Sequence, residues 1–394
     1  MNVKRLPFRF PVLLSFAIVW LTGCLPLGHP VAMAGHSGSS GVPPNVAVVL
    51  DRLIQAVSDT NAAPIDPSEL EGLIRFTESN PEPGEGIAIQ SLANATSALY
   101  RFDVRQSLRY ILEIGYHPDI PGFIVSPSSV RIAYWKSVDG MEKPFPKLWP
   151  MLDGPLHRPV VVRGIEHEEI TPDQFMGTYY AYDVQRLLIL MRHHGRSILV
   201  SVGRQKDVSE VGKKGAVLGK DDDWTYLYSG ENGMNARGLG WVDSYMYAAG
   251  TVMVYDETSS DPNPRVRCTV FKWLRAGWAG INMVQTHHIL AGMDRFSNAF
   301  RQVVESSKLP PAEEMARVFR EIRSMGEPQL QEAIWNYVAR LKEQAMAAGS
   351  SASAFYGKYF GSEEQAIKRM NAEQMRSLLV LETLKTWLGK PGTS

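Results

Sequence analysis

Apolar residues near the start of the chain recur every three to four positions, which is the spacing of one face of an α-helix. The side chains on this face are Val46, Val49, Leu50, Leu53, Ile54 and Val57. Asp66-Pro67-Ser68-Glu69 has the layout of a helix N-terminal capping box with proline in the first turn. A longer helical pattern covers residues 86–114. We therefore expect residues 45–115 to form an N-terminal helical segment.

The helical spacing returns in the last part of the chain. After Pro310 and Pro311 it predicts helices over about 312–324, 328–347 and 372–388. The last helix begins at a cap-like Asn371 and ends before a glycine and a proline, which rarely continue a helix. We expect residues 311–394 to form a C-terminal helical segment.

Between these segments apolar and polar residues alternate, which is typical of β-strands. The clearest element is a hairpin, in which residues 186–192 and 197–202 flank a tight turn at His194-Gly195. This turn pairs apolar residues on one buried side of the sheet: Leu187, Ile189 and Met191 with Val202, Val200 and Ile198. The other side is mixed, which favours a partly covered or ligand-facing surface. Its residues are Leu188, Leu190, Leu199, Arg186, Arg192, Ser197 and Ser201.

Further strands are expected at about 224–228, 241–247, 251–255 and 265–273. After Gly280 the spacing is helical again, with Thr286 as the cap and an apolar stripe that contains Ile289, Met293, Phe296, Phe300 and Val303. Strands followed by a long helix and then by separate helices favour the α+β class. We expect a curved antiparallel sheet packed against this long helix in a domain of residues 116–310.

The order of these elements over about 155–305, with Trp273 to Asn282 at the junction between sheet and helix, is similar to the helix-grip fold of START-like lipid-transfer domains. This resemblance implies a cavity between the sheet and the helix for an apolar ligand. It implies no catalytic residue.

The composition is that of an ordinary globular protein, with 44% hydrophobic and 21% charged residues among 394 positions. Basic and acidic residues each number 41, so the formal net charge is zero. A chain without excess positive charge has no general attraction to nucleic acid, and we expect no nucleic-acid partner.

The first residues have the three parts of a secretory signal: the cations Lys4, Arg5 and Arg9, an apolar stretch, and small residues. The apolar stretch is too short to span a membrane, for which about 20 residues are needed. Leu21-Thr22-Gly23-Cys24, at the end of this leader, resembles the bacterial lipobox. The resemblance implies that residues 1–23 are removed as a signal peptide and that the acylated Cys24 anchors the protein to a membrane.

Leu25 follows the cysteine, where an aspartate would resemble an inner-membrane retention signal of enteric bacteria. The resemblance therefore favours the outer membrane, facing the periplasm, over the inner membrane. Residues 24–44 are rich in Gly, Pro, Ser and Ala and are expected to form a lipidated flexible tether. The second cysteine, Cys268, lies in an apolar alternating run and is interpreted as a small buried hydrophobic residue.

The sequence contains no motif for catalysis, for a metal or for a cofactor. A helical H-E-x-x-H and a G-x-S-x-G are both absent. Glu166-His167-Glu168-Glu169 is interpreted as a polar cluster, and Asp221-Asp222-Asp223 as a solvated turn. The pairs His193-His194 and His287-His288 are interpreted as turn and cap residues. We therefore assign no catalytic or metal-ligating residue and expect no cofactor.

Aromatic residues alternate with other side chains along the expected strands: Trp224, Tyr226, Tyr228, Trp241, Tyr245, Tyr247 and Trp273. One interpretation is an aromatic-rich core. The other is a pocket whose rings bind an apolar ligand, with hydroxyl groups left to orient it. For that pocket the ligand-lining candidates are Trp241, Asp243, Tyr245, Tyr226 and Trp273.

These patterns predict an envelope lipoprotein that is not an enzyme and that binds either a hydrophobic small molecule or a partner protein. Two alternatives stay open. One is an enzyme without a recognisable motif. The other is a structural subunit of an envelope complex that docks through the helices of residues 312–388.

Overall fold

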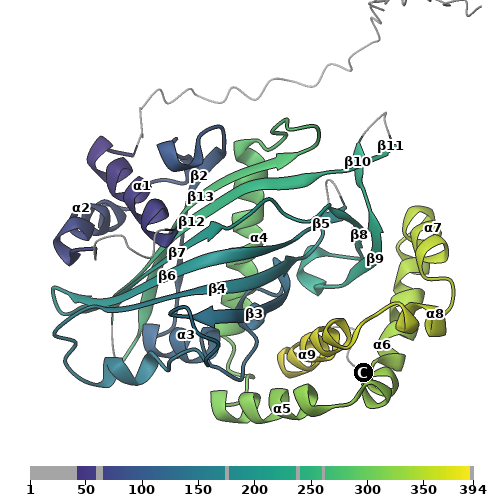
Figure 1. Ribbon diagram of the computed structural model, residues 1–394. Coiled ribbons are helices and arrows are strands. Elements are labelled where there is room, and N and C mark those ends of the chain that lie inside the picture. Colours follow the sequence, from purple (N-terminus) through teal and green to yellow (C-terminus); the bar gives the residue numbers. More distant parts are fainter. Residues whose placement is uncertain (1–41, 59–64, 174–176, 237–239, 260–261, 391–394) are drawn as a thin grey trace, which may run out of the picture. The chain divides into compact units, whose positions relative to one another are not determined.

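The computed structural model describes residues 42–58, 65–173, 177–236, 240–259 and 262–390. Within these residues the fold is of the α+β class and is built on a large antiparallel sheet (Figure 1). The expected signal peptide and Cys24 lie outside the described residues, as does most of the expected tether.

Eight strands of the described residues form this sheet, in the order β1-β2-β13-β12-β7-β6-β4-β3, and every neighbouring pair is antiparallel. Consecutive buried apolar residues in the central strands, such as Leu187 to Met191 of β6, point alternately to the two sides and give the sheet two apolar faces. The strand bounds are β1 Gly84–Glu85, β2 Thr96–Val104, β3 Val130–Val138, β4 Val160–Ile170, β6 Ala181–His193, β7 Arg196–Gln205, β12 Tyr245–Ser259 and β13 Arg265–Gly277.

Helices α1 (Pro44–Ser58) and α2 (Pro67–Glu78) cover one face of the sheet (Figure 1). The expected capping box at Asp66 begins α2. Beneath these helices lies the apolar side of the β6–β7 hairpin, in the predicted register: Leu187 pairs with Val202, Ile189 with Val200 and Met191 with Ile198. The hairpin prediction is confirmed, because the turn fixes the register and the register fixes which residues are buried.

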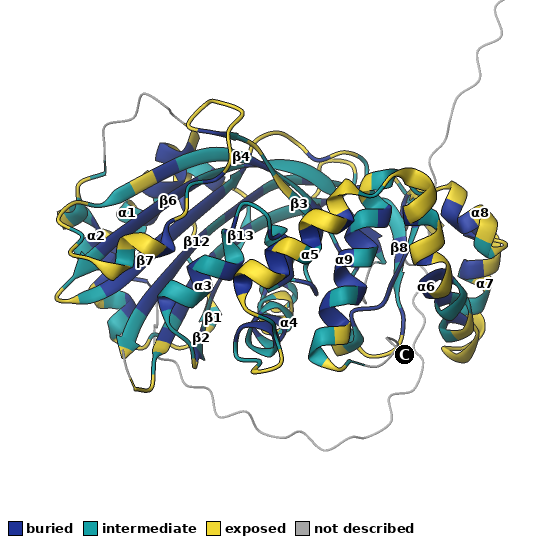
Figure 2. Cartoon of the chain, turned by 90° about the horizontal axis from the view of Figure 1, so that it is seen from below, coloured by how far each residue is buried: buried dark blue, intermediate teal, exposed yellow. Residues whose placement is uncertain are grey.

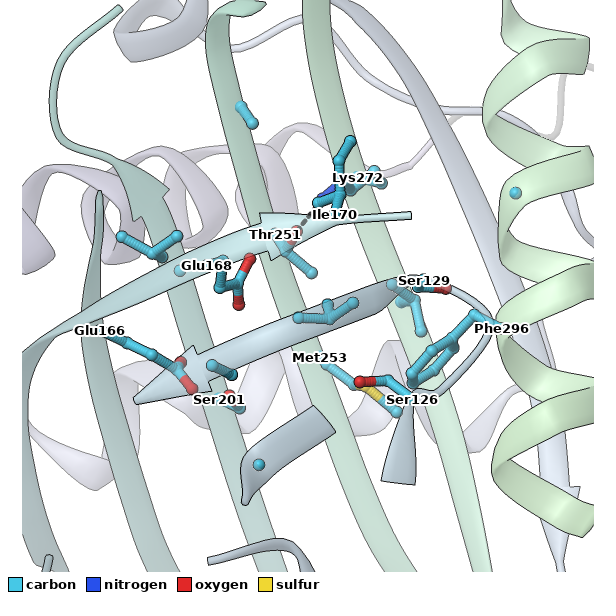
Figure 3. Close-up of a pocket in the computed structure, with 18 of the residues that line it drawn as sticks. Ser126, Ser129, Glu166, Glu168, Ile170, Ser201, Thr251, Met253, Lys272 and Phe296 are labelled. Carbon is cyan, nitrogen blue, oxygen red and sulfur yellow. Dashed lines mark hydrogen bonds between the residues drawn. The ribbon is translucent and has the colours of Figure 1, made fainter. Parts of the chain in front are cut away.

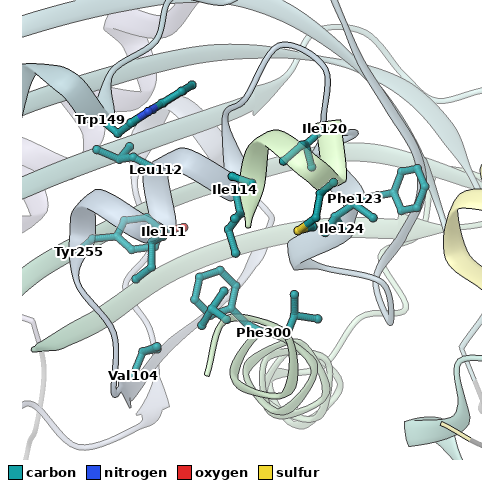
Figure 4. Packing of buried hydrophobic residues seen from close by; sticks show 14 of the residues in the cluster. Val104, Ile111, Leu112, Ile114, Ile120, Phe123, Ile124, Trp149, Tyr255 and Phe300 are labelled. Atoms are coloured by element: carbon teal, nitrogen blue, oxygen red, sulfur yellow. The ribbon is translucent and has the colours of Figure 1, made fainter. Parts of the chain in front are cut away.

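The opposite face is covered by α3 (Leu108–Gly115), α4 (Thr286–Val304), α5 (Ala312–Ser324) and α9 (Ala372–Leu388), as Figure 2 shows. Figure 4 shows how Ile111 and Leu112 of α3 and Phe300 of α4 pack close to Tyr255 of β12. The sheet is therefore the middle layer between helices, with an apolar cluster on each face.

A smaller three-stranded sheet of β5 (Thr178–Tyr179), β8 (Lys213–Val217) and β9 (Tyr226–Asn232) supports the remaining C-terminal helices. These helices are α6 (Glu327–Ala347), α7 (Ser350–Tyr359) and α8 (Glu363–Lys368). The helices predicted over 312–324 and 372–388 are confirmed at those bounds, and the one predicted over 328–347 begins one residue earlier. The prediction did not include α7 and α8.

The helix predicted over residues 86–114 is wrong. These residues contain a 3-10 turn (Gln90–Leu92), β2 and α3. In β2, Leu99 points to the cluster under α1 and α2, and Phe102 and Val104 point to the opposite cluster. This alternation has the period of a strand. Pairing with β13 stabilises the strand over any local helical tendency.

The strands predicted at 241–247 and 251–255 also differ from the structure. Residues 240–242 form the short strand β11 (Gly240–Val242), which pairs with β10 (Met234–Ala236). Residues 245–259 form the single long strand β12. Trp224, predicted to begin a strand, has a φ of +51° in a turn, and β9 begins at Tyr226.

Candidate functional site

A cavity of about 410 Å³ lies between the large sheet and α4 (Figure 3). This volume is within the range of small-molecule sites, roughly 300–1,000 Å³. Strands β3, β4, β6, β7, β12 and β13 contribute to its wall, so residues far apart in sequence meet there. The cavity is the candidate functional site because one part of its wall is apolar and another carries charged groups.

Sulfur-containing, aromatic and aliphatic side chains form the apolar part of the wall. They come from β12, β13 and α4: Met253, Tyr255, Val270, Met293, Phe296 and Phe300. Figure 3 shows Phe296 on α4 and Met253 on β12 approaching each other across the space. This wall can bind an alkyl chain or a ring, since it removes apolar surface from water.

Small residues on the cavity face of the strands leave the space open. Ser201, Gly203 and Ala249 line the cavity where neighbouring positions of the sheet carry large side chains. A Cβ atom at Gly203 would lie 2.8 Å from Nη1 of Arg186, so a larger residue there would displace the arginine. Gly203 therefore contributes to the position of the charged groups.

A buried ion cluster forms the polar part of the wall. Nε of Arg186 on β6 donates to Oε2 of Glu166 on β4 over 2.7 Å, and Nη2 donates to Oε1 of Glu168. Burial raises the pKa of the Glu166 carboxyl, and Arg186 only partly offsets this effect. Burial also disfavours the charge of Arg186, but the two carboxylates outweigh it and raise the pKa of the arginine. Arg186 is therefore cationic and holds both glutamates.

Lys272 of β13 also lines the cavity, and its Nζ donates to Oγ1 of Thr251 on β12 over 2.9 Å (Figure 3). Among the described residues no carboxylate oxygen lies within 4.0 Å of this Nζ. Burial lowers the pKa of Lys272, whereas the charge of Glu168 acts in the opposite direction. Lys272 is thus a cavity-facing amine without an ion pair in the part of the chain that is described.

Two tyrosines complete the polar part. The hydroxyl group of Tyr116 and Oγ of Ser201 are 3.5 Å apart, and both residues line the cavity. Burial raises the pKa of Tyr182 well above its ordinary value of 10.0, and it also raises the pKa of Tyr116. Both phenols are therefore neutral near pH 7 and can donate or accept a hydrogen bond.

Arg295 connects α4 to the loops beside the cavity. It donates to the carbonyl oxygen of Ser128 and to Oγ1 of Thr171, and it lies 3.6 Å from a carboxylate oxygen of Asp221. These contacts hold α4 against the loops that border the cavity. The cavity is consequently bounded by a tethered helix.

No family model, curated protein or solved structure matches this chain.

The candidate site is therefore defined by its own residues alone. Most of them differ from the residues predicted from the aromatic pattern. Tyr226 is buried, 5.9 Å from the guanidinium of Arg295, and contributes to the core. Trp273 lies on the other face of the sheet, where its Nε1 donates to the carbonyl oxygen of Ile87 over 2.6 Å. Asp243 is exposed, and Tyr245 packs beside Tyr247.

Of the described ligand candidates, Tyr226, Asp243, Tyr245 and Trp273 are not in the cavity wall. Trp241 belongs to β11, but its side chain is outside the described part of the structure. Sequence reasoning missed Glu166, Glu168 and Lys272, although the two glutamates have the spacing of one strand face. It did place Arg186 and Ser201 on a partly covered or ligand-facing side of the hairpin, and both line the cavity.

Among the described residues, Cys268 and the possible metal-ligating side chains do not form a second site. Cys268 is buried, and burial raises the pKa of its thiol well above the ordinary value, so it is a poor nucleophile. Over the described ranges, no group of three or more His, Cys, Asp and Glu side chains is arranged to hold a metal ion. In the same residues no helix is both long enough and apolar enough to cross a membrane.

Proposed function

We propose that the protein is an envelope lipoprotein that binds an amphipathic small molecule in the cavity between the sheet and α4, without catalysing a reaction. The observation that carries this proposal is the division of one cavity wall into an apolar part and a charged part. A ligand with an alkyl or ring body and one polar end would match both parts. A curved sheet closing on a long helix, as in the helix-grip fold, is the architecture that we propose for this binding.

Helices α5 and α9 of the C-terminal segment give little support to the alternative of a docking arm. Apolar residues of α5 and α9 belong to the same buried cluster as the sheet, including Met315, Phe319 and Leu384. Helices whose apolar faces are already packed in the protein's own core have little left for a partner. A ligand-binding role is therefore the better-supported proposal.

Native mass spectrometry of the protein isolated from its own envelope tests this proposal. We expect a co-purifying amphipathic molecule, released on denaturation. A matched pair of variants places the site. Gly292 of α4 lines the cavity, and Gly357 of α7 does not; both are exposed helix glycines, and a Cβ atom added at either would have no neighbouring atom within 4 Å.

Gly292→Phe should reduce the amount of bound molecule, because its ring would occupy space at the cavity wall. Gly357→Phe makes the same change of helix residue away from the cavity and should retain the parent amount. Absence of any bound molecule in the parent, together with failure of added amphiphiles to bind, would refute the proposal. Equal loss in both variants would place binding elsewhere.

A further inference from the structure

Among the residues that the structure describes, the polar part of the cavity contains a cation, Lys272, that forms no ion pair with a carboxylate. Glu166 and Glu168 both accept hydrogen bonds from Arg186, so each of these two side chains has the arginine as its ionic partner. Within the described residues, Nζ of Lys272 has a hydroxyl group as its hydrogen-bond partner and no carboxylate within 4.0 Å. An ammonium group has three donors, and enclosing it without a counter-charge is unfavourable.

The strand register places this lysine next to the apolar wall. Lys272 of β13 lies opposite Thr251 of β12, and two residues along the same strands Val270 lies opposite Met253. All four residues line the cavity. Side chains two residues apart share a strand face and are separated by roughly 7 Å along it. The polar pair of Lys272 and Thr251 is therefore directly followed, on the same face, by the apolar pair of Val270 and Met253.

Helix α4 extends the apolar surface beyond the second pair. Phe296 and Phe300 of α4 line the same cavity as Met253 and Val270, and Phe296 faces Met253 in Figure 3. A chain-shaped molecule with its polar end at Lys272 would place its body between Met253 and Phe296. Among the described residues, the cavity therefore extends from a lysine amine without a carboxylate partner to an aromatic wall.

We infer that the ligand is an aliphatic carboxylic acid whose carboxylate is bound by Lys272 and the hydroxyl group of Thr251, with its alkyl chain against Met253, Val270 and Phe296. This inference rests on the proposed function and specifies its ligand. The carboxylate supplies the counter-charge that Lys272 lacks, and a charge-assisted hydrogen bond is stronger than a neutral one. Arg186 binds both Glu166 and Glu168 and thereby reduces their repulsion of the ligand's carboxylate.

Three probes with the same alkyl chain test the head group: decanoic acid, decanol and decylamine. Binding is measured by isothermal titration calorimetry to the full-length Cys24→Ser chain, stripped of lipid. We expect the acid to bind at least about tenfold more tightly than the alcohol, since a hydrogen bond to a charged group contributes about 1.5–3 kcal/mol. The amine should bind more weakly than the alcohol.

Lys272→Met keeps the length of the side chain and removes its charge. It should abolish the preference for the acid, because the charge that distinguishes a carboxylate from a hydroxyl group is removed while Met253, Val270 and Phe296 remain to bind the alkyl chain. Lys272→Arg should retain the preference. Lys206→Met, at an exposed loop position, is the control and should bind all three probes as the parent does. If Lys272→Met does not fold, Thr251→Val serves as the second variant and should weaken acid binding selectively.

Equal binding of acid and alcohol, or an unchanged acid preference in Lys272→Met, would overturn the inference while leaving the proposed function in place. A preference for decylamine would also overturn it, because the glutamates would then hold the head group. Failure of all three probes to bind, with no co-purified molecule, would refute the proposed function instead.

Discussion

Lys272 and Thr251 lie directly opposite each other on β13 and β12, and the lysine donates to the threonine hydroxyl group over 2.9 Å. The next residue of β13, Trp273, points to the other face of the sheet, into the cluster under α1 and α2. Two neighbouring residues thus belong to different layers. Because successive side chains of a strand point to opposite faces, a candidate ligand contact and a core residue occupy adjacent positions.

This separation predicts different effects of substitution at the two positions. Trp273→Ala should destabilise the fold by about 3–5 kcal/mol, because it leaves a cavity in a packed core. It should leave decanoic acid affinity within about twofold of the parent, because a substitution on the far face removes no ligand contact. Urea unfolding and calorimetry measure the two effects. Tyr245→Ala, at a half-buried ring, should cost less stability and is the control. Loss of ligand binding without loss of stability in Trp273→Ala would place the ligand on the other face.

The hairpin register gives a second prediction. Val200 is fully buried between the sheet and the α1–α2 layer, opposite Ile189. Val200→Asp should cost more than about 3 kcal/mol, since it buries a charge without a partner. Val161→Asp on β4, where the valine is 48% exposed, makes the same change at the surface and should cost less than about 1 kcal/mol. Equal unfolding midpoints in urea for the two variants would contradict the observed burial.

The hairpin could be predicted from sequence because its turn and its two strands are adjacent in the chain. The turn at His194-Gly195 sets the register, and the register sets the buried face. The position of β2 could not be predicted in this way. Its residues pair with residues far along the chain, as Leu99 of β2 does with Phe271 of β13. No local sequence pattern predicts such a long-range pairing.

The cavity was harder to predict than the fold. The pairing of Lys272 with Thr251 depends on the register of β12 and β13, which includes irregularities between Met246 and Ala248 and between Glu257 and Ser259. Each bulge changes which side chains share a face. The aromatic pattern favoured Trp273 as a ligand contact, but in the observed register its neighbour Lys272 lines the cavity and Trp273 lies on the other face of the sheet.

The lipobox resemblance provides a third prediction, about residues outside the described structure. Cys24→Ser should abolish labelling by a radioactive fatty acid and should release the protein from membranes, because acylation needs the cysteine thiol and stable anchoring needs the acyl chains. Labelling and membrane fractionation measure this. Cys268→Ser is the control for loss of a thiol and should stay labelled and membrane-bound. Retention of both properties in Cys24→Ser would exclude this anchor.

The buried Glu166 gives a fourth prediction, about pH. Burial raises its pKa above the ordinary 4.5, so over the interval between these values the folded protein keeps a proton that the unfolded chain has lost. The unfolded state therefore binds fewer protons, and the contribution of Glu166 to stability falls as the pH rises through that interval. Glu166→Gln removes this titration and still offers an oxygen to Arg186.

Urea unfolding of the parent and of Glu166→Gln over a pH series that begins below 4.5 measures the effect. The free energy of unfolding of the variant should increase relative to the parent as the pH rises, and should then become constant above the raised pKa. Glu332→Gln, at an exposed position of α6, controls for the loss of a carboxylate. A difference that instead increases as the pH falls would mean that Arg186 outweighs burial and holds Glu166 in its charged form.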